Sequence, residues 1–228
     1  MPRVLEARQV ATRIVKRLRE KGFTAYFAGG CVRDELLGQH PTDYDVATDA
    51  TPDDIRGLFN STNEVGASFG VMLVHMFGRT VEVATFREED EYTDRRRPDR
   101  VHYSDAPNDA RRRDFTINAL FLDPLAEPED GAETAGFGRV DGVVIDYIGG
   151  VADLKAGIVR AVGDPEKRLS EDHLRALRAV RFAARLEFLL DPDTAAAVRR
   201  HATDLEGVSR ERIGHELRKM LGHPTRAI

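Results

Sequence analysis

Two aspartates separated by one residue, Asp43 and Asp45, follow a glycine pair, Gly29-Gly30, that itself follows a short apolar run. In a strand, side chains at i and i+2 point to the same face, so Asp43 and Asp45 present two carboxylates together. Glycine has no Cβ, which lets a phosphate approach the backbone closely. Mg²⁺ is held by one or two carboxylates and completes its shell with water and substrate phosphates. The pattern therefore predicts a strand–turn–helix–strand unit that binds a magnesium triphosphate for nucleotidyl transfer.

Each part of this pattern also has a plainer interpretation. An Asp-x-Asp pair and a glycine pair both occur in ordinary strand–turn–helix connections with solvated aspartates. The glycine pair is neither a Walker A loop nor a Rossmann fingerprint. Glu82, on a later predicted strand, is either a third carboxylate of the site or a surface acid at a strand edge.

Composition limits the class of protein. The chain has 228 residues, of which 41% are hydrophobic, so it can form one or two domains with a proper core. The formal charge of the chain is −5. Residues 95–113 nevertheless contain seven arginines and three aspartates, so this segment could bind a polyanionic partner. The single cysteine, Cys31, excludes an intrachain disulfide and a Cys-based zinc site. Signal-peptide and membrane-span patterns are absent, which favours a cytosolic protein with no membrane partner.

Hydrophobic periodicity divides the chain into two parts. We expect an α+β domain over residues 1–162, with a mixed β-sheet and flanking helices, and an all-helical domain over residues 163–228. The first part is expected to contain helices over 4–20, 32–37 and from Thr51, strands over 23–28 and 43–47, a hairpin over 71–77 and 80–87, loops over 88–100 and 124–138, and strands and turns over 139–162.

Within the helical part, the first helix is predicted to begin at Ser170, and further helices are predicted over 194–201 and 209–221. On the first of these helices, an apolar stripe alternates with arginines at steps of three and four residues. The stripe consists of Leu174, Leu177, Val180 and Ala184, and the arginines are Arg175, Arg178, Arg181 and Arg185.

The run Arg112-Arg113-Asp114, followed by Asn118, is a second candidate for nucleotide binding. Arginine offers a planar fork for phosphate or ribose oxygens, and an aspartate accepts a hydrogen bond from a ribose hydroxyl. Equally, the two arginines fit surface charges and Asp114 fits a helix N-cap.

A third candidate surrounds Glu171, Asp172 and Arg175. Their spacing fits ion pairs within one helix, Glu171 with Arg175 and Asp172 with Arg175. The alternative is that Asp172 and Arg175 offer an acceptor and donors to the Watson–Crick edge of a base, so that the protein chooses the nucleotide. Arg178 and Arg181 would then hold the triphosphate or the acceptor backbone.

Taken in order, these segments resemble the motifs of the class II tRNA nucleotidyltransferase (CCA-adding enzyme) and bacterial poly(A) polymerase family. The first motif is carried by Phe27–Asp34 with Asp43–Thr48. The later motifs are similar to Arg112–Leu120, Asp141–Leu154, Arg168–Phe182 and Ser209–Leu217. Five ordered motifs cover nearly the whole chain.

The resemblance implies roles for the motif residues. Asp43 and Asp45 would bind the catalytic Mg²⁺ ions, with Glu82 as a third candidate. Gly29, Gly30 and Arg33 would lie against the triphosphate, and Asp172 and Arg175 would read the base. The remaining nucleotide-binding candidates are Arg112, Arg113, Asp114, Asn118, Arg178 and Arg181, and the segment 88–100 matches a flexible loop of the family.

The resemblance further implies template-independent addition of CMP and AMP to the 3′ end of tRNA, from CTP and ATP, with pyrophosphate released. Bacterial poly(A) polymerase and separate A-adding or C-adding activity share the motifs, and an idle RNA-binding or nucleotide-sensing module is the alternative from another class. Family members are typically longer, so we expect a nucleotidyltransferase-type head and a helical neck, without the body and tail regions that grip tRNA.

Overall fold

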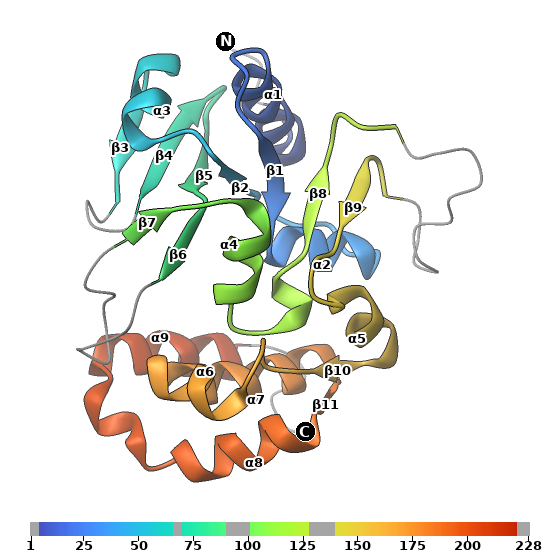
Figure 1. The fold of residues 1–228 in the computed structure, drawn as a ribbon, viewed down its shortest axis with the longest axis vertical. Helices are drawn as coiled ribbons and strands as arrows, with labels where there is room; N and C mark the ends of the chain where they lie inside the picture. Colours follow the sequence, from blue (N-terminus) through green and yellow to red (C-terminus); the bar gives the residue numbers. More distant parts are fainter. Residues whose placement is uncertain (1–4, 66–69, 90–100, 128–139, 223–228) are drawn as a thin grey trace. The chain divides into compact units, whose positions relative to one another are not determined.

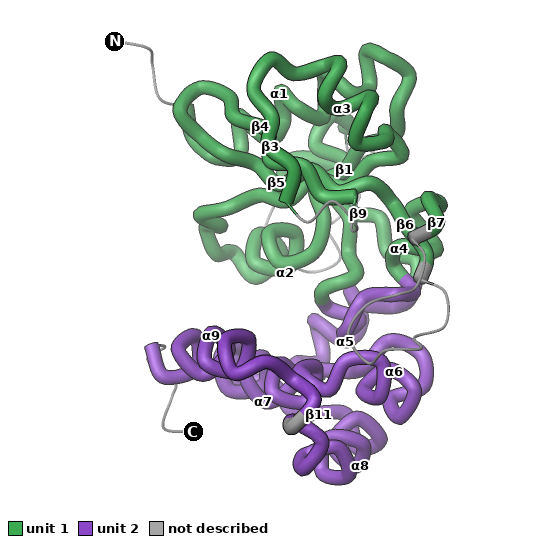
Figure 2. The backbone as a smooth tube through the Cα atoms, turned by 90° about the vertical axis from the view of Figure 1, so that its left-hand side faces the viewer, with its two compact units in different colours: residues 1–88, 101–110, 118–147 green, residues 89–100, 111–117, 148–228 purple. Residues whose placement is uncertain are grey.

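The structure is a computed structural model that describes residues 5–65, 70–89, 101–127 and 140–222. It divides the chain into two compact units, which Figure 2 distinguishes by colour. The first unit contains residues 1–88, 101–110 and 118–147, and the second contains residues 89–100, 111–117 and 148–228.

A seven-stranded mixed sheet forms the centre of the first unit (Figure 1). Its strand order is β3-β4-β5-β2-β1-β8-β9, and all neighbouring strands are antiparallel except β2 and β5, which are parallel. The strands are β1 (Ala25–Ala28), β2 (Asp45–Thr48), β3 (Thr62–Glu64), β4 (Val71–Met76), β5 (Arg79–Thr85), β8 (Phe121–Asp123) and β9 (Val143–Ile145).

Helix α1 (Ala7–Arg19) packs against β1, β2 and β5. Its apolar residues recur every three or four positions, so they form one stripe that the sheet buries. The buried stripe consists of Val10, Ala11, Ile14, Val15 and Leu18. The shorter elements of this region are α2 (Gly30–Leu36), α3 (Pro52–Leu58), α4 (Ala106–Arg112), the 3₁₀ helix η1 (Thr116–Asn118) and a two-stranded ribbon of β6 (Arg87–Glu89) and β7 (Val101–Tyr103).

Helix α7 (Leu174–Leu186) is the central element of the second unit. It contacts α6 (Pro165–Glu171), α8 (Pro192–His201) and α9 (Arg210–Leu221). The rings of Phe115 and Phe182 meet edge to face at 5.8 Å. The other elements of this unit are α5 (Gly150–Ala156), the parallel pair β10 (Ile158–Val159) and β11 (Leu189–Leu190), and the 3₁₀ helix η2 (Asp204–Gly207).

The predicted fold class, a mixed α+β sheet domain followed by a helical region, is confirmed. The predictions of helix or strand were also correct for α1, β1, β2, α3 and the β4–β5 hairpin. A capping box opens α3, since Thr51 and Asp54 bond to each other's backbone amides. None of the helices in the described ranges combines the length and apolarity that crossing a membrane requires.

Two local predictions for residues 1–162 were wrong. The segment 139–162 contains α5 as well as strands, because Gly149, at φ 84°, starts a helix that is too short for periodicity to reveal. The ribbon strand β6 extends to Glu89, where a loop was expected. The predicted loops otherwise fall largely on 90–100 and 128–139, which lie outside the described residues.

The predicted helix from Ser170 is also interrupted. Helix α6 already begins at Pro165, because the Asp164 side chain caps it, and it ends at Glu171. Asp172 is extended, with φ −150° and ψ 103°, before α7 begins. The predicted apolar stripe is correct only in part: Leu174 is buried, but Val180 is 39% exposed. The buried face of α7 also includes Ala176, Ala179 and Phe182.

Candidate active site

Three carboxylates lie on two neighbouring strands of the first unit. Asp45 begins β2 and is paired in register with Glu82 on the parallel strand β5. Asp43 lies just before β2; it is exposed like Asp45, whereas Tyr44 and Val46 are buried. This alternation places Asp43 and Asp45 on one side of the strand. The three side chains thus offer only oxygen ligands, the donor set that fits a hard divalent cation such as Mg²⁺.

Tyr44 anchors the strand segment between the two aspartates. It is 6% exposed, and its ring meets that of Phe27 edge to face at 5.1 Å. Its hydroxyl donates to Glu35 of α2, and Glu35 in turn accepts from Nε of Arg8 at 2.8 Å. Burial, followed by the bond to Glu35, raises the pKa of Tyr44 well above its usual range, so the hydroxyl stays a donor. The segment of Asp43 and Asp45 is therefore connected to α1 and α2 through a partly buried hydrogen-bond chain.

Replacing Tyr44 with phenylalanine is expected to lower the free energy of unfolding by about 1.5–3 kcal/mol, the contribution of a hydrogen bond to a charged group. The ring, and with it the contact to Phe27, is retained. Urea denaturation measures the change. Tyr103→Phe is the matched control because Tyr103 is 52% exposed; an equal loss of stability in both variants would contradict this assignment.

Backbone conformation requires a glycine at only one of the two positions of the turn. Gly29 has φ 75° and ψ −125°, a region that side chains with a Cβ rarely adopt, and its amide donates to the Leu120 carbonyl at 2.9 Å. At Gly30, an added Cβ would meet only Nη2 of Arg33, at 3.6 Å. Contact of Gly29 and Gly30 with a triphosphate stays a prediction.

Two other predicted site residues of the first unit are buried and bonded to each other. Arg33 is 2% exposed; its Nε and Nη2 donate to Oδ1 of Asp34 at 2.7 and 2.6 Å, and its Nη1 donates to Asn118. Two positions before Arg33, burial raises the pKa of the Cys31 thiol to about 12, which favours the protonated thiol at neutral pH. The structure thus gives Arg33 and Asn118 a role in fixing α2.

In the second unit, Asp114 is joined to α7. Its Oδ2 accepts from Nε and Nη2 of Arg178 at 2.8 and 2.6 Å, a two-point contact. The charge of Asp114 raises the pKa of Arg178. Arg112 and Arg113 are half-buried, and the Arg112 carbonyl accepts from Arg168 at 3.1 Å. The structure therefore brings two predicted nucleotide-binding residues, Asp114 and Arg178, into direct contact.

The predicted base-reading pair, Asp172 and Arg175, lies at the break between α6 and α7. Oδ2 of Asp172 accepts from Nη2 of Arg212 in α9 at 2.7 Å, and its Oδ1 accepts from the Leu174 amide at 3.1 Å. Nη1 of Arg175 donates to Glu171 and, at 2.8 Å, to the Arg168 carbonyl. The expected ion pair between Glu171 and Arg175 is therefore present. Asp172 also pairs with Arg212 of α9, which was not expected.

Arg181 is held inside the helical unit. It is 5% exposed and pairs with Glu216 of α9, which is 3% exposed; Nη1 of Arg178 lies 3.7 Å from the same carboxylate. Burial lowers the pKa of Arg181, while the charge of Glu216 opposes this shift. The geometry assigns Arg181 a structural contact, and its predicted contact with a nucleotide stays a prediction.

The predicted residues fall on both units (Figure 2). Sequence reasoning missed the side chains that hold them, because these partners are remote in the sequence. Tyr44, Arg212 and Glu216 appeared only as parts of motifs, and Arg8 and Glu35 carried no signal. The first unit contains Gly29, Gly30, Arg33, Asp43, Asp45, Glu82 and Asn118, and the second contains Arg112, Arg113, Asp114, Asp172, Arg175, Arg178 and Arg181.

Several known proteins are similar to this chain in sequence. A family profile described as "Poly A polymerase head domain" matches residues 25–160, and one described as "Probable RNA and SrmB- binding site of polymerase A" matches residues 187–228. CCA-adding enzymes from Levilactobacillus brevis and Geobacillus stearothermophilus are 42% and 40% identical over 93% and 95% of the chain. The chain spans about half the length of the curated relatives it matches, 50% in both cases.

Solved structures agree with the sequence comparison. The Bacillus stearothermophilus CCA-adding enzyme in complex with CTP has a TM-score of 0.81 at 38% identity, over 95% of this chain and 49% of its own. A tRNA nucleotidyltransferase complexed with a primer tRNA and an incoming ATP analog has a TM-score of 0.70 at 28% identity, over 95% and 57%. From the matched profile, the relatives and the shared fold, the chain belongs to the class II CCA-adding enzyme and poly(A) polymerase family.

Proposed function

We propose that the chain supplies the catalytic and nucleotide-selecting parts of a template-independent RNA nucleotidyltransferase that adds CMP and AMP to the 3′ end of tRNA. The substrates are CTP and ATP, and pyrophosphate is released. The observation that carries this proposal is the set of exposed carboxylates, Asp43, Asp45 and Glu82, on neighbouring strands of a chain similar to CCA-adding enzymes. The cytosolic location expected from the sequence belongs to the same proposal.

The carboxylate set suits the chemistry of nucleotidyl transfer. This reaction depends on positioning and on neutralising charge, with little covalent work for the protein. When bound, a divalent cation supplies an activated 3′-hydroxyl and charge stabilisation at the α-phosphate and the leaving pyrophosphate. Asp43 and Asp45 would hold the cation, which we take to be Mg²⁺, and the paired Glu82 is the candidate for a third ligand.

Asp172 and Arg175 suit the selection of cytosine and adenine. Both bases carry an exocyclic amino group beside an unprotonated ring nitrogen on their Watson–Crick edge. A carboxylate accepts from the amino group, and a guanidinium donates to the ring nitrogen. Uracil and guanine present a carbonyl beside an N–H group at these places, which reverses both bonds. Support comes from the bonds of Asp172 to Arg212 and of Arg175 to Glu171, which hold both side chains in place.

Poly(A) polymerase activity is the second candidate, because the profile that matches residues 25–160 is described by that name. The deciding experiment supplies tRNA acceptors lacking CCA, or lacking only the final A, with labelled CTP or ATP and Mg²⁺. Incorporation of both nucleotides supports CCA addition, and ATP incorporation alone supports an A-adding enzyme or a poly(A) polymerase. Binding of CTP and ATP without incorporation, at saturating RNA, would refute the enzyme and favour a nucleotide-sensing module.

Replacing Arg175 with alanine is expected to reduce discrimination against UTP and GTP about ten-fold or more, because a hydrogen bond to a charged group contributes about 1.5–3 kcal/mol. The measured quantity is the ratio of CTP or ATP incorporation to UTP or GTP incorporation, which a general loss of stability leaves unchanged. Arg199→Ala, at an exposed position of α8, is the control. An unchanged ratio in Arg175→Ala would count against base reading by this residue.

A further inference from the structure

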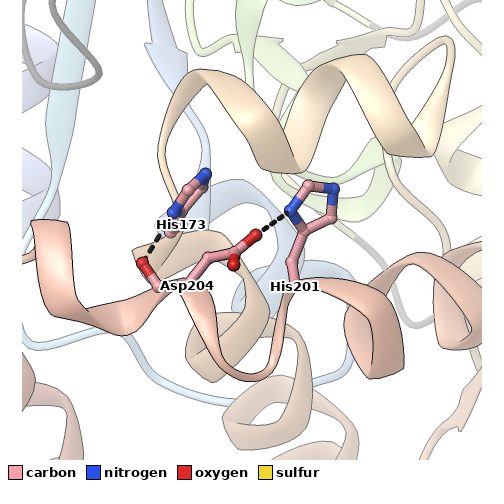
Figure 3. A group of neighbouring side chains, drawn as sticks. All are labelled: His173, His201 and Asp204. Carbon is pink, nitrogen blue, oxygen red and sulfur yellow. Dashed lines mark hydrogen bonds and ion pairs between the residues drawn. The ribbon is translucent and has the colours of Figure 1, made fainter.

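A group of potential metal ligands lies in the helical unit, outside the carboxylate set on the sheet. His173 directly precedes α7, His201 is the last residue of α8, and Asp204 begins η2. Figure 3 shows the Asp204 side chain between the two imidazole rings. The ring centroids are 5.4 Å apart, and one ligand atom from each residue lies within 4.8 Å of the others. His201 and Asp204 are three positions apart, and His173 lies 31 residues before Asp204, so two separate segments bring two imidazoles and one carboxylate together.

The surroundings of His201 match those of a metal-binding histidine. Its Nδ1 lies 2.9 Å from Oδ2 of Asp204, and its Nε2 lies 3.2 Å from Oε2 of Glu166 in α6. Histidines that bind a metal through one nitrogen usually donate the other N–H to a carboxylate or a carbonyl. Glu166 also accepts from Nε of Arg200 at 2.6 Å, so its carboxylate is bonded on both sides. Nδ1 of His201 can therefore face a cation while Nε2–H is already bonded.

His173 is fixed by a bond of the same kind. Its Nδ1 lies 2.7 Å from the backbone carbonyl of Asp204, and the residue is 5% exposed. Because a carbonyl only accepts, Nδ1 carries the hydrogen, and a neutral ring keeps its lone pair on Nε2. The side chains of His201 and Asp204 are 14% and 39% exposed, which leaves a route for an ion from solvent.

We propose that His173, His201 and Asp204 form a binding site for Zn²⁺ or a similar divalent transition metal, which joins the start of α7 to the connection between α8 and η2. Imidazole ligands select such metals, whereas Mg²⁺ prefers a shell of oxygens. Ligand atoms around a tetrahedral zinc ion with bonds of about 2.0 Å are about 3.3 Å apart. Metal binding must therefore bring the three ligand atoms, which lie within 4.8 Å of one another, closer together. His173 follows Asp172, so the metal would also stabilise the segment that carries the proposed base-reading residues.

The test is a titration of the chelator-treated chain with Zn²⁺ by calorimetry, and with Co²⁺ by its visible absorption. Asp43→Asn/Asp45→Asn serves as background, with excess Mg²⁺ present, so that the oxygen site does not contribute. One equivalent of metal is expected to bind and to raise the Tm, because the ion binds only the folded state. This outcome is independent of nucleotidyl transfer, so it can fail or succeed separately from the proposed function.

Variants identify the ligands. His201→Gln and Asp204→Asn are each expected to weaken Zn²⁺ binding at least ten-fold, and Glu166→Gln about ten-fold through its bond to His201. His215→Gln, at an exposed position of α9, is the control and should bind as the parent does. Circular dichroism verifies that each variant is folded. No bound equivalent in the parent, or equal affinity in the parent, His201→Gln and Asp204→Asn, would overturn the proposal and leave a cluster held by hydrogen bonds alone.

Discussion

Asp43→Asn and Asp45→Asn are each expected to reduce nucleotide incorporation about a thousand-fold or more. A bound divalent cation contributes several kcal/mol to stabilising charge in the transition state, and about 4 kcal/mol corresponds to three decades in rate. Asparagine keeps the size of the side chain but removes the charge that holds the cation. The measurement is incorporation of labelled CTP at saturating RNA and Mg²⁺.

The same substitutions should change the free energy of unfolding by no more than about 0.5 kcal/mol, because both side chains are exposed. Asp53→Asn is the control, since the Asp53 carboxylate is 88% exposed on α3 and lies outside the carboxylate set. Glu82→Gln then separates its two interpretations: a third ligand predicts a loss approaching that of Asp45→Asn, and a surface acid predicts full activity. Normal turnover in Asp43→Asn or Asp45→Asn would refute the metal assignment.

Glu216→Ala is expected to destabilise the chain by about 3–5 kcal/mol, the cost of breaking a buried ion pair from one side. Arg181 and Glu216 are 5% and 3% exposed, so the substitution leaves a buried guanidinium without its carboxylate. The neighbouring Arg178 loses a second contact to the same group. Urea denaturation, followed by the helical signal, measures the change.

Two further variants make this prediction specific. Glu211→Ala, at an exposed position of the same helix, should cost no more than about 0.5 kcal/mol. The double replacement Arg181→Met/Glu216→Leu removes both charges and should regain much of the lost stability, because no unpaired charge remains buried. A cost below about 1 kcal/mol for Glu216→Ala, or a double variant less stable than Glu216→Ala, would show that the pair is not the source of the stability.

Local sequence patterns predicted the elements whose stabilising contacts are local or periodic. The five buried residues of α1 follow helical spacing, and the capping residues of α3 are three positions apart. The alternation around Tyr44 also placed Asp43 and Asp45 on one face. These features depend only on backbone geometry and on the separation of polar from apolar residues, which neighbouring residues encode.

The sequence-based predictions failed where contacts between residues far apart in the sequence determine the local structure. The break at Asp172 depends on its bonds to the Leu174 amide and to Arg212, forty residues away. The pair of Arg175 with Glu171, four residues apart, was expected from helical spacing, whereas the pair of Arg181 with Glu216, 35 residues away, was not. Periodicity cannot anticipate an ion pair between helices, and it therefore placed part of the buried face of α7 incorrectly.

The proposed nucleotide transfer depends on the carboxylates at β2 and β5. The most direct measurement is single-turnover incorporation of labelled CMP into tRNA lacking CCA, with pyrophosphate release followed in parallel, for the parent chain and for Asp45→Asn. We expect Mg²⁺-dependent transfer with one pyrophosphate released per nucleotide in the parent, and loss of both signals in the folded variant. Equal transfer by the two proteins, or no transfer by a parent chain that binds CTP and RNA, would contradict the proposal.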